Sequence, residues 1–526
     1  MFRSPFADVE IPDQPLTDHV LARARELGDK PALIEAATGR TLTYEGLIGE
    51  VQAMAAGLAQ LGFGKGDVFA HYAPNVPEYA VAFHGVASVG GINTTANPLL
   101  TPDELAQQLT DSGARFLVTV PQLLDKALAA AQRAELEDVF VYGEAEGATP
   151  FRTLLEEGGE PPAVEIDPAE DLVALPYSSG TTGLPKGVML THRNLVANIC
   201  QMGAPHHIDH DERVIAVLPF FHIYGMVVIL NAALAHGATL VTMPRFELPD
   251  YLRALQEHRI TRAYVVPPIA LAMAKHPLVD EFDLSSLRIM LSGAAPLGPE
   301  LQAACGARVD CGVVQGYGMT ETSPVTHVVP DDQAGEGMGS IGFPVPNTEC
   351  RVVDIGTDED VETGEPGELL IRGPQVMKGY LNNPDATAAT IDENGWLHTG
   401  DIARVDEDER FWIVDRLKEL IKYKGYQVAP AELEALLLNH EAIADAAVIG
   451  IADEEAGEAP KAFVVVKTQI TPEEVSAYVA SHVAPYKRLR AVELLDEIPK
   501  SPSGKILRRV LVERERERQA TAGAPG

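Results

Sequence analysis

The feature that most constrains the fold is an alternation of two kinds of segment, which continues up to about Asp401. Short apolar runs rich in β-branched residues, such as 116–120, 214–218 and 288–291, alternate with segments of helical period, such as 43–61 and 248–258. Strands that alternate with helices in this way form parallel sheets. The helical segments carry few charges, which fits helices that cover both faces of a sheet. The sequence therefore predicts an α/β fold with mainly parallel sheets.

The composition changes near Asp401. A charged, hairpin-like segment (405–415) leads into a Lys-rich segment and then into a mixed strand and helix pattern that ends near Arg509. A chain of 526 residues also exceeds the usual limit of a single domain, about 250–300 residues. We therefore expect a large N-terminal domain of parallel-sheet α/β subdomains, residues 1–416, joined by a hinge to a small α+β C-terminal domain, residues 417–526.

The longest apolar stretch, residues 226–243, is long enough to be tested as a membrane span. It contains Asn231, His236 and Gly237, and a β-rich run follows the glycine. This pattern favours a buried helix followed by a strand. The chain opens with no basic and apolar leader and ends on no targeting signal, so we expect a cytoplasmic protein.

Charge and cysteine content exclude several classes of partner. The formal net charge of −35 disfavours nucleic acid and anionic membranes, because both require basic patches. The segment 206–212 has imidazole and carboxylate groups but no metal-binding spacing, so we expect a solvated loop there. Neither a disulfide framework nor a zinc site is expected, since no CxxC pair occurs among the cysteines. These are Cys200, Cys305, Cys311 and Cys350.

The strongest chemical signal is the segment 177–188, YSSGTTGLPKGV. Its glycines allow backbone N–H groups to turn towards an anion, and its hydroxyls and Lys186 add further donors. Apolar runs on both sides place it on a loop between two strands. It is not a Walker A loop, because no Lys-Ser or Lys-Thr pair follows the last glycine. A loop of this composition is often a mere connector, but its GLPKG ending is more specific to phosphate binding.

Other segments offer groups that suit a nucleotide and an acid. His222 and Tyr224 lie two apart at an expected strand end, where alternation points both to one face. The segment 292–297, SGAAPL, is a small-residue turn that a flat ring could approach. The segment 315–321, QGYGMTE, offers hydroxyl and carboxylate groups for phosphate and Mg²⁺. Asp401 could accept both hydroxyls of a ribose.

Taken together and in this order, these segments resemble the adenylate-forming superfamily of acyl-CoA synthetases, luciferases and adenylation domains of peptide synthetases. The resemblance covers essentially the whole chain, and the wording is most similar to 4-coumarate–CoA ligases and their bacterial relatives. It is carried by FFHIYG, VVPPIALAMAKHPLV, DLSSLR, SGAAPLG, QGYGMTE, GWLHTGD, VDRLKELIKYKGYQVAPAELE and SPSGKILRR.

The resemblance implies a ligase that uses ATP, Mg²⁺ and coenzyme A. The enzyme would convert a small carboxylic acid, 4-coumarate or a related hydroxycinnamate, to its CoA thioester through an acyl-adenylate, with release of pyrophosphate and AMP. The C-terminal domain would rotate about Lys418, presenting Lys505 for the first half-reaction and the Lys422 face for the second. No carrier-protein domain is expected in the chain.

The resemblance also implies roles for individual residues. The catalytic set is Lys505, Lys422, His222 and Thr320. The nucleotide would be bound by Ser178, Ser179, Gly180, Thr181, Thr182, Lys186, Ala294, Gln315, Gly316, Tyr317, Thr320, Asp401, Arg416, Lys418, Gln427 and Lys505, with Glu321 on Mg²⁺. The acyl group would contact His222, Tyr224, Ala294, Gly316, Pro324 and Val325, and CoA would contact Arg245, Lys424 and Gly425. Arg245 stands where the plant enzymes usually carry a lysine.

Alternatives remain at this point. A medium-chain fatty acyl-CoA synthetase is the main rival, although the hydroxyl of Tyr224 favours a phenolic acid. A luciferase is disfavoured by the wording of FFHIYG and the absence of a peroxisomal tripeptide, and a peptide-synthetase module by the absence of a carrier domain after Arg509. A non-catalytic nucleotide-binding sensor would not need Lys505, Lys422 and the hinge together.

Overall fold

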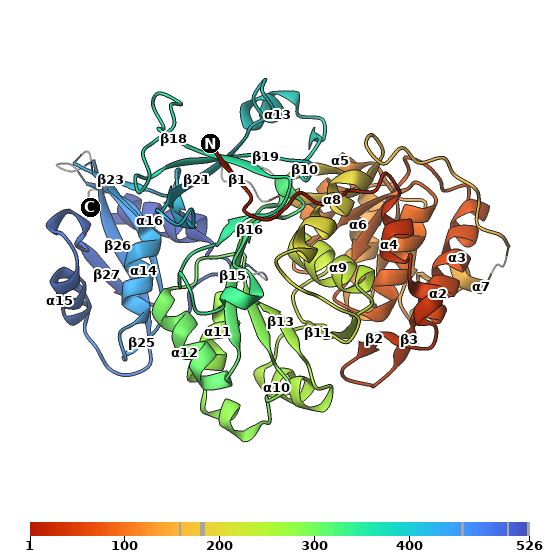
Figure 1. Cartoon of the computed structure of the whole chain (residues 1–526), viewed down its shortest axis with the longest axis horizontal. Coiled ribbons are helices and arrows are strands. Elements are labelled where there is room, and N and C mark those ends of the chain that lie inside the picture. The colour runs from red at the N-terminus through yellow and green to blue at the C-terminus, as the bar shows by residue number, and fades with distance from the viewer. Residues whose placement is uncertain (157–158, 179–184, 425, 454–456, 502–503, 523–526) are drawn as a thin grey trace.

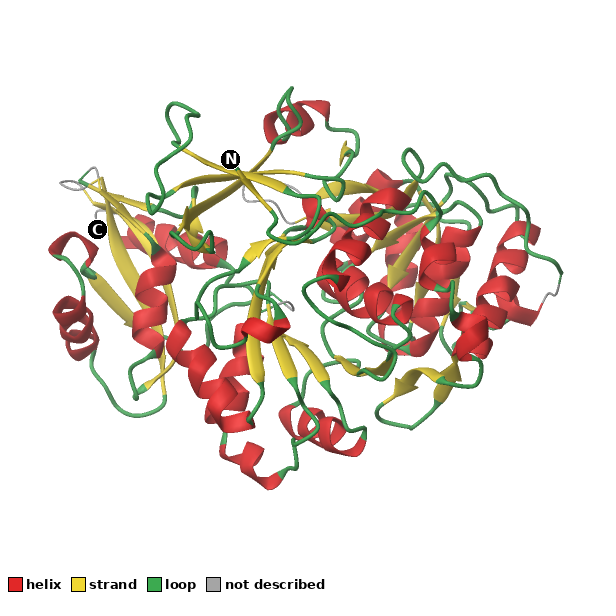
Figure 2. Cartoon of the chain, in the orientation of Figure 1, coloured by secondary structure: helices red, strands yellow, loops and turns green. Residues whose placement is uncertain are grey.

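The computed structural model describes residues 1–526 except 157–158, 179–184, 425, 454–456, 502–503 and 523–526. The C-terminal part of the chain, blue in Figure 1, forms a separate unit beside α11 and α12 of the larger N-terminal part. Figure 2 shows layers of strands covered by helices through most of the molecule. The predicted α/β class, with a large N-terminal domain and a small α+β C-terminal domain, is confirmed.

The first sheet has the strand order β20-β10-β9-β5-β4-β6-β7-β8, and its central strands are parallel. Its strands are β4 (Val68–Tyr72), β5 (Ile92–Thr95), β6 (Ala114–Thr119), β7 (Asp138–Val141), β8 (Thr149–Pro150), β9 (Leu172–Ser178), β10 (Lys186–Thr191) and β20 (Gly379–Tyr380). Its helices include α3 (Tyr44–Gln60), α4 (Pro77–Ser88), α5 (Pro102–Ser112), α6 (Leu124–Arg133) and α8 (His192–Gly203). β9 and β10 are antiparallel, so they bring the two ends of the predicted phosphate loop together.

The second sheet has the order β17-β16-β15-β14-β13-β11-β12-β2-β3 and is parallel from β15 to β2. Its strands are β2 (Pro31–Glu35), β3 (Thr41–Thr43), β11 (Arg213–Ala216), β12 (Thr239–Thr242), β13 (Arg262–Val265), β14 (Ile289–Ser292), β15 (Gly312–Gly318), β16 (Val325–Val328) and β17 (Phe343–Pro344). Helices α10 (Leu248–Glu257), α11 (Pro267–Lys275) and α12 (Pro299–Val309) connect its parallel strands. The parallel strands carry their carboxyl ends to one edge, where the segments after β13, β14 and β15 meet.

A third sheet, β1-β18-β19-β21-β22, is antiparallel, and the sequence did not predict it. It comprises β1 (Phe2–Arg3), β18 (Glu349–Val353), β19 (Gly367–Arg372), β21 (Leu397–Val405) and β22 (Phe411–Arg416). The expected hairpin at 405–415 is therefore its β21–β22 turn. The sheet ends at Arg416, and a turn over residues 417–419 leads into the C-terminal part.

The C-terminal part forms a fourth sheet, β24-β23-β26-β25, with β27 beside β26. Its strands are β23 (Ile421–Tyr423), β24 (Tyr426–Val428), β25 (Ile443–Asp453), β26 (Gly457–Val466) and β27 (Ala491–Leu494), and its helices are α14 (Pro430–Leu438), α15 (Pro472–His482) and α16 (Arg508–Ala522). Helix α15 starts at a capping box, in which the Thr471 hydroxyl accepts from the Glu474 N–H. Helix α14 has no cap of its own, since Ala429 occupies its N-cap position.

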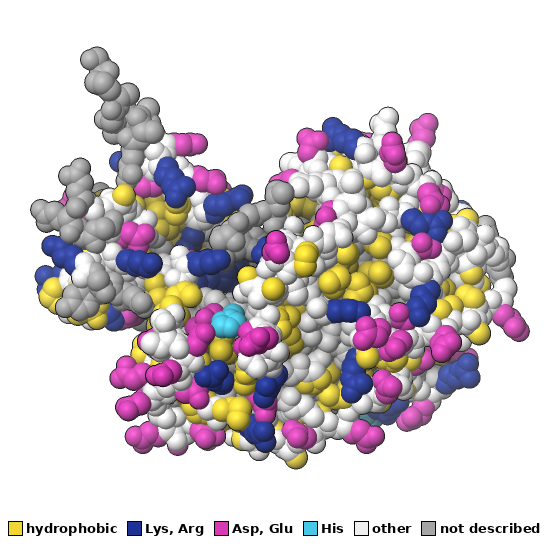
Figure 3. Space-filling model, turned by 90° about the horizontal axis from the view of Figure 1, so that it is seen from above, with side chains coloured by type: hydrophobic (Ala, Val, Ile, Leu, Met, Phe, Trp, Pro, Cys, Tyr) yellow, Lys and Arg dark blue, Asp and Glu magenta, His cyan; other side chains and the backbone are white. Residues whose placement is uncertain are grey.

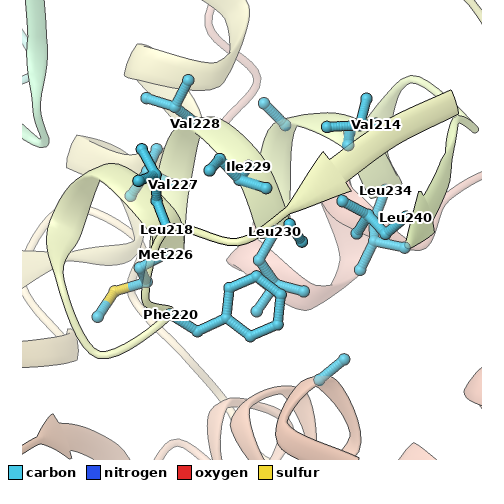
Figure 4. Packing of buried hydrophobic residues seen from close by; sticks show 14 of the residues in the cluster. Val214, Leu218, Phe220, Met226, Val227, Val228, Ile229, Leu230, Leu234 and Leu240 are labelled. Atoms are coloured by element: carbon cyan, nitrogen blue, oxygen red, sulfur yellow. The ribbon is translucent and has the colours of Figure 1, made fainter. Parts of the chain in front are cut away.

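The apolar stretch 226–243 lies in the core. It forms a π-helix (Tyr224–Asn231), the short α9 (Ala232–Ala235) and the strand β12, which confirms the predicted buried helix and strand. Figure 4 shows how Met226, Val228 and Leu230 project from this helix among other apolar side chains. Among the described residues, no helix combines the length and apolarity needed to cross a bilayer.

One local prediction is wrong, and another holds only in part. His222 and Tyr224 do not lie at a strand end, because β11 already stops at Ala216; His222 lies in a bend, and Tyr224 begins the π-helix. The segment 206–212 is solvated only in its middle. His206 is buried with its Nδ1 2.8 Å from Asp331, and Glu212 is buried against Arg262.

Candidate active site

Lys505 lies on a tight turn at the boundary between the C-terminal part and the second sheet. The Ser501 N–H donates to the Lys505 carbonyl, and the Gly504 N–H donates to the Ser501 carbonyl, each at 2.8 Å. Gly504 has φ +77°, and a Cβ at this position would lie 3.2 Å from Val266, which directly follows β13. The turn therefore packs closely on the N-terminal part, and a larger residue than glycine would push it away.

The Lys505 ammonium lies among charged groups. Burial, followed by the nearby Arg416, lowers the pKa of Lys505 to about 8, while Glu419 and Asp401 oppose this shift. Burial, followed by the charge of Lys505, lowers the pKa of His222 to about 4. His222 is therefore neutral near pH 7. Its Nδ1 accepts the Tyr224 N–H at 3.2 Å, so the ring carries its proton on Nε2 and keeps that group as a donor.

Asp401 is the second charged group of this cluster. It pairs with Arg416 across β21 and β22, and the Arg416 Nε lies 3.3 Å from its Oδ1. The Tyr317 hydroxyl donates to the Asp401 Oδ2 at 2.5 Å. Burial raises the pKa of Asp401, and the charge of Arg416 opposes this shift. The structure thus brings together Tyr317 from the second sheet, Asp401 and Arg416 from the third, His222 from the bend after β11 and Lys505 from its turn.

The β9–β10 hairpin holds the predicted phosphate-binding residues. Ser178 and Lys186 face each other as register partners. Between them, Ser179, Gly180, Thr181 and Thr182 fall outside the described residues. Thr320 and Glu321 lie in a short 3₁₀ helix (Thr320–Thr322), and the Glu321 carboxylate is buried.

The buried Glu321 carboxylate suits a cation. Its Oε1 accepts from the Tyr380 hydroxyl at 2.9 Å, and no ion pair joins it to a basic residue in the part of the chain that the structure describes. A buried carboxylate is costly unless a cation or several donors compensate its charge. A hard oxygen ligand beside hydroxyl groups matches the preference of Mg²⁺, so the residues present fit that ion.

Tyr224 lies beside the segment that follows β14. Its hydroxyl donates to the Leu291 carbonyl at 3.1 Å, and its ring packs edge-on against Tyr264 with centroids 6.2 Å apart. A Cβ at Gly293 would lie 3.1 Å from the Tyr224 ring, so only glycine leaves the ring undisturbed. Ala294 has a left-handed backbone (φ +67°) and an exposed side chain.

The other predicted pocket residues lie on β15 and β16. The Gln315 side chain is buried and bonds to both the N–H and the carbonyl of Leu297, so its amide supports the loop after β14. Val325 begins β16, and both its N–H and its carbonyl bond to the Asn198 side chain. Gly316 lies within β15, and Pro324 directly precedes β16. Asn198 is thus a support of the pocket that the sequence did not indicate.

Comparison with known proteins identifies the family. Residues 20–381 match the model of the AMP-binding enzymes, and residues 432–505 match the model of the AMP-binding enzyme C-terminal domain. The chain belongs to the family of AMP-binding enzymes.

Two full-length relatives of this AMP-binding enzyme are 4-coumarate–CoA ligases. A 4-coumarate–CoA ligase 5 from Oryza sativa subsp. japonica is 46% identical over 523 residues, which cover 97% of this chain and 96% of the relative. A 4-coumarate–CoA ligase from Pinus taeda is 45% identical over 522 residues, with 97% of each chain covered. These relatives confirm the predicted class of reaction, ATP-dependent ligation of an acid to CoA through an adenylate.

Solved structures agree with this assignment. An anthranilate CoA ligase, AuaEII, in complex with anthranoyl-AMP aligns with a TM-score of 0.88 at 27% identity, over 98% of this chain and 99% of that one. ATP-bound MatB from Rhodopseudomonas palustris aligns with a TM-score of 0.86 at 27% identity, over 96% of this chain and 99% of that one.

Several predicted residues of the AMP-binding enzyme lie away from the Lys505 cluster. Lys422 is exposed on β23, where its N–H donates to Glu458. Lys418 is exposed in the turn after β22, and Arg245 is exposed beside Glu247. Gln427 on β24 is the register partner of Lys422, and Lys424 is exposed on the turn between β23 and β24. Gly425 lies outside the described residues.

Basic side chains gather on one side of the molecule. Figure 3 shows several Lys and Arg side chains close together on the side of the molecule that holds the C-terminal part. The acidic side chains are spread over the remaining surface in this view. A protein of net charge −35 thus still offers a local positive surface for anionic substrates.

The sequence missed a buried charge network that adjoins the Lys505 turn. Arg508 binds the Glu434 carboxylate at 2.7 Å and that of Glu419 at 2.8 Å. Asp415, at the end of β22, accepts the Ala431 N–H at 3.0 Å and so caps α14 from outside the C-terminal part. Burial raises the pKa of Asp415 to about 6. A signal for this cap was the lack of a capping side chain before Pro430.

Proposed function

We propose that this AMP-binding enzyme is a hydroxycinnamate–CoA ligase that acts on 4-coumarate or a close relative. The names of the full-length relatives support this substrate class. In the first half-reaction, a carboxylate oxygen attacks the α-phosphorus of ATP and pyrophosphate leaves. In the second, the CoA sulfur attacks the acyl carbonyl carbon and AMP leaves.

Lys505 and His222 would serve the first half-reaction. Two anions, a carboxylate and a triphosphate, must approach each other in this step. A fixed ammonium and a neutral imidazole N–H stabilise the charge that develops between them, without a need for water to reorganise. The desolvated position of Lys505 strengthens this effect, because bulk water screens the charge of the ammonium less there.

The other nucleotide-binding residues would contact different parts of ATP. Asp401 and Arg416 would bind the ribose, and Tyr317 would lie against the adenine. Ser178, Lys186 and Thr320 would bind the phosphates, together with residues 179–182. Glu321 would hold Mg²⁺, which when bound neutralises phosphate charge.

The observation that carries the choice of acid is the bonding of Tyr224. Its hydroxyl proton is directed to the Leu291 carbonyl, so its oxygen retains lone pairs that can accept a hydrogen bond. A 4-hydroxyl on the substrate ring would donate to it. A fatty acid offers no such donor, which distinguishes the proposed substrate from a medium-chain fatty acid.

The domain division at residue 416 and the CoA contacts complete the proposal. We place the hinge at Lys418, the thioester-forming face at Lys422 with Gln427, and the CoA contacts at Arg245, Lys424 and Gly425. We also propose that the enzyme works in the cytoplasm.

The test is kcat/KM for 4-coumarate, cinnamate and octanoate in the wild type and in Tyr224→Phe. The wild type should prefer 4-coumarate over cinnamate by about tenfold to a hundredfold, the value of about 1–3 kcal/mol for one buried hydrogen bond. Tyr224→Phe should remove most of that preference by lowering the 4-coumarate value. Tyr44→Phe, which removes a buried hydroxyl bonded to the Ala238 carbonyl, is the control and should keep the preference. A wild type that favours octanoate would refute the proposed substrate.

A further inference from the structure

Tyr380 lies where three segments of the active site meet. It ends the two-residue strand β20, which pairs with β10 so that Tyr380 faces Val188 across the ladder. Its N–H donates to the Thr387 hydroxyl at 2.9 Å. The preceding Gly379 has φ +148°, and a Cβ there would lie 2.8 Å from Thr387. The backbone thus fixes the position of Tyr380 closely.

The Tyr380 side chain contacts two groups of opposite charge. Its hydroxyl donates to the Glu321 Oε1 at 2.9 Å, and the Lys186 Nζ lies 4.7 Å from the centroid of its ring. The side chain is buried, so both contacts lie out of bulk solvent.

This arrangement replaces a direct ion pair. Lys186 and Glu321 belong to segments far apart in the sequence, yet both contact the Tyr380 side chain. No salt bridge joins them within the described residues. If the two charges paired with each other, the ammonium would be withdrawn from an anionic ligand and the carboxylate from a cation. The ring face attracts the ammonium through its quadrupole, while the hydroxyl at the far end orients the carboxylate.

We propose that Tyr380 is a positioning residue that holds Lys186 for the phosphates of ATP and Glu321 for the accompanying Mg²⁺, and keeps them from neutralising each other. The inference rests on the proposed roles of Lys186 and Glu321. It assigns to one side chain the spacing between the phosphate ligand and the metal ligand, so its removal should affect nucleotides according to their phosphates and their metal.

Two variants separate the contacts. Tyr380→Phe keeps the ring and removes the hydroxyl bond to Glu321. Loss of a hydrogen bond to a metal-binding carboxylate weakens metal affinity by about tenfold to a hundredfold. Tyr380→Leu also removes the ring, and the loss of a cation–π contact should weaken ATP binding by a further factor of about three to thirty. Tyr72→Phe is the control, because it removes a buried hydroxyl that bonds to the Pro98 and Leu100 carbonyls.

The measurements are calorimetric affinities for ATP with Mg²⁺, ATP with EDTA, and AMP, together with the Mg²⁺ concentration at half-maximal adenylate formation. For Tyr380→Phe we expect the ATP affinity with Mg²⁺ to fall about tenfold or more, the half-maximal Mg²⁺ concentration to rise by a similar factor, and the AMP affinity to be unchanged. Thioester formation from supplied acyl-adenylate should also be unchanged.

Two outcomes would overturn the inference. A Tyr380→Phe variant that binds ATP with Mg²⁺ as tightly as the wild type would show that the hydroxyl does not position Glu321. Equal losses for ATP and AMP would show a general structural role. If the wild type itself forms no adenylate with any acid, the proposed function fails instead, because that result does not depend on Tyr380. If Tyr380→Leu does not fold, Tyr380→Phe alone decides.

Discussion

Two lysines of the C-terminal part stand in contrasting surroundings. Lys505 lies on a turn that packs against Val266, and burial lowers its pKa to about 8. Lys422 lies on the β23–β24 hairpin, where its side chain is exposed. Both belong to segments that the resemblance assigns to catalysis, yet only one of them reaches the cluster around Asp401.

The contrast between the two lysines follows from how the C-terminal part packs against the N-terminal part. Lys422 lies on β23 of the fourth sheet and Lys505 on the turn before α16, and in the observed orientation Lys505 is at the active site while Lys422 is at the surface. If Lys505 serves adenylate formation, as proposed, the observed orientation is the one suited to that half-reaction. A second orientation is required if Lys422 serves thioester formation. Variants that affect one orientation should therefore affect the two half-reactions unequally.

The largest effect should come from Lys505→Ala. Loss of one charge-stabilising donor lowers a rate by about 10²–10³, so pyrophosphate release should fall by that factor. Thioester formation from supplied acyl-adenylate should be largely intact. Lys422→Ala is the matched variant and should show the reverse pattern. Pyrophosphate release near the wild-type rate in Lys505→Ala would refute the role of this lysine.

Alkaline pH should reproduce this loss reversibly. With a pKa of about 8, the Lys505 ammonium is lost as the pH rises, so adenylate formation should fall about tenfold per unit above pH 8, or about a hundredfold by pH 10. Stability should change in the opposite sense. Between pH 8 and the ordinary lysine pKa of 10.5, the unfolded state binds more protons at this site than the folded state does. The contribution of Lys505 to the free energy of unfolding therefore rises with pH in this range. Lys505→Arg stays charged and should abolish the alkaline loss, which a pH profile of both proteins would check.

Restricting the hinge should affect the half-reactions unequally. Proline at 418 fixes φ in the turn between β22 and β23. We expect adenylate formation to survive in Lys418→Pro and thioester formation to fall by about tenfold, because the second orientation becomes less accessible. The two half-reactions measured separately provide the test. Equal losses in both would place the hinge elsewhere.

The smallest effect should come from the cap of α14. Asp415→Ala removes the acceptor for the Ala431 N–H, at a cost of about 1 kcal/mol, equivalent to about fivefold. This cost falls on the observed orientation, so adenylate formation should fall by about that factor while thioester formation from supplied adenylate does not. Thr471→Ala removes the cap of α15 within the same C-terminal part. It should leave the ratio of adenylate formation to thioester formation unchanged. An equal response of the two variants would contradict an orientation effect.

Much of the fold was predictable because its signals are local. Alternating apolar runs indicated the parallel strands, and apolar segments on both sides of the Gly/Ser/Thr loop indicated the β9–β10 hairpin. The third sheet gave no comparable signal, since it pairs β1, at residues 2–3, with β18, at residues 349–353. Pairing over such a distance depends on tertiary structure and not on local propensity.

The active site was predictable as a set of residues but not as a set of contacts. The error at His222 and Tyr224 arose because an apolar run reads alike in a strand and in a fully buried helix. The hydrogen bond between Tyr317 and Asp401 joins two sheets, and neither sequence segment indicates it. Tyr380 lies in a short MKGYLNN segment that resembles an ordinary turn, and only its contacts with Lys186 and Glu321 distinguish it.

The π-helix that starts at Tyr224 makes the shape of the acyl pocket depend on the number of residues in this helix. A π-helix accommodates more residues per turn than an α-helix, and here the Asn231 side chain donates to the Met226 carbonyl within it. Deletion of one residue between Gly225 and Asn231 would let the helix tighten to α geometry. With its later end held by α9 and β12, its first residue would turn by about 100°. A deletion distant from the substrate could therefore reshape the acyl pocket while every pocket side chain keeps its identity.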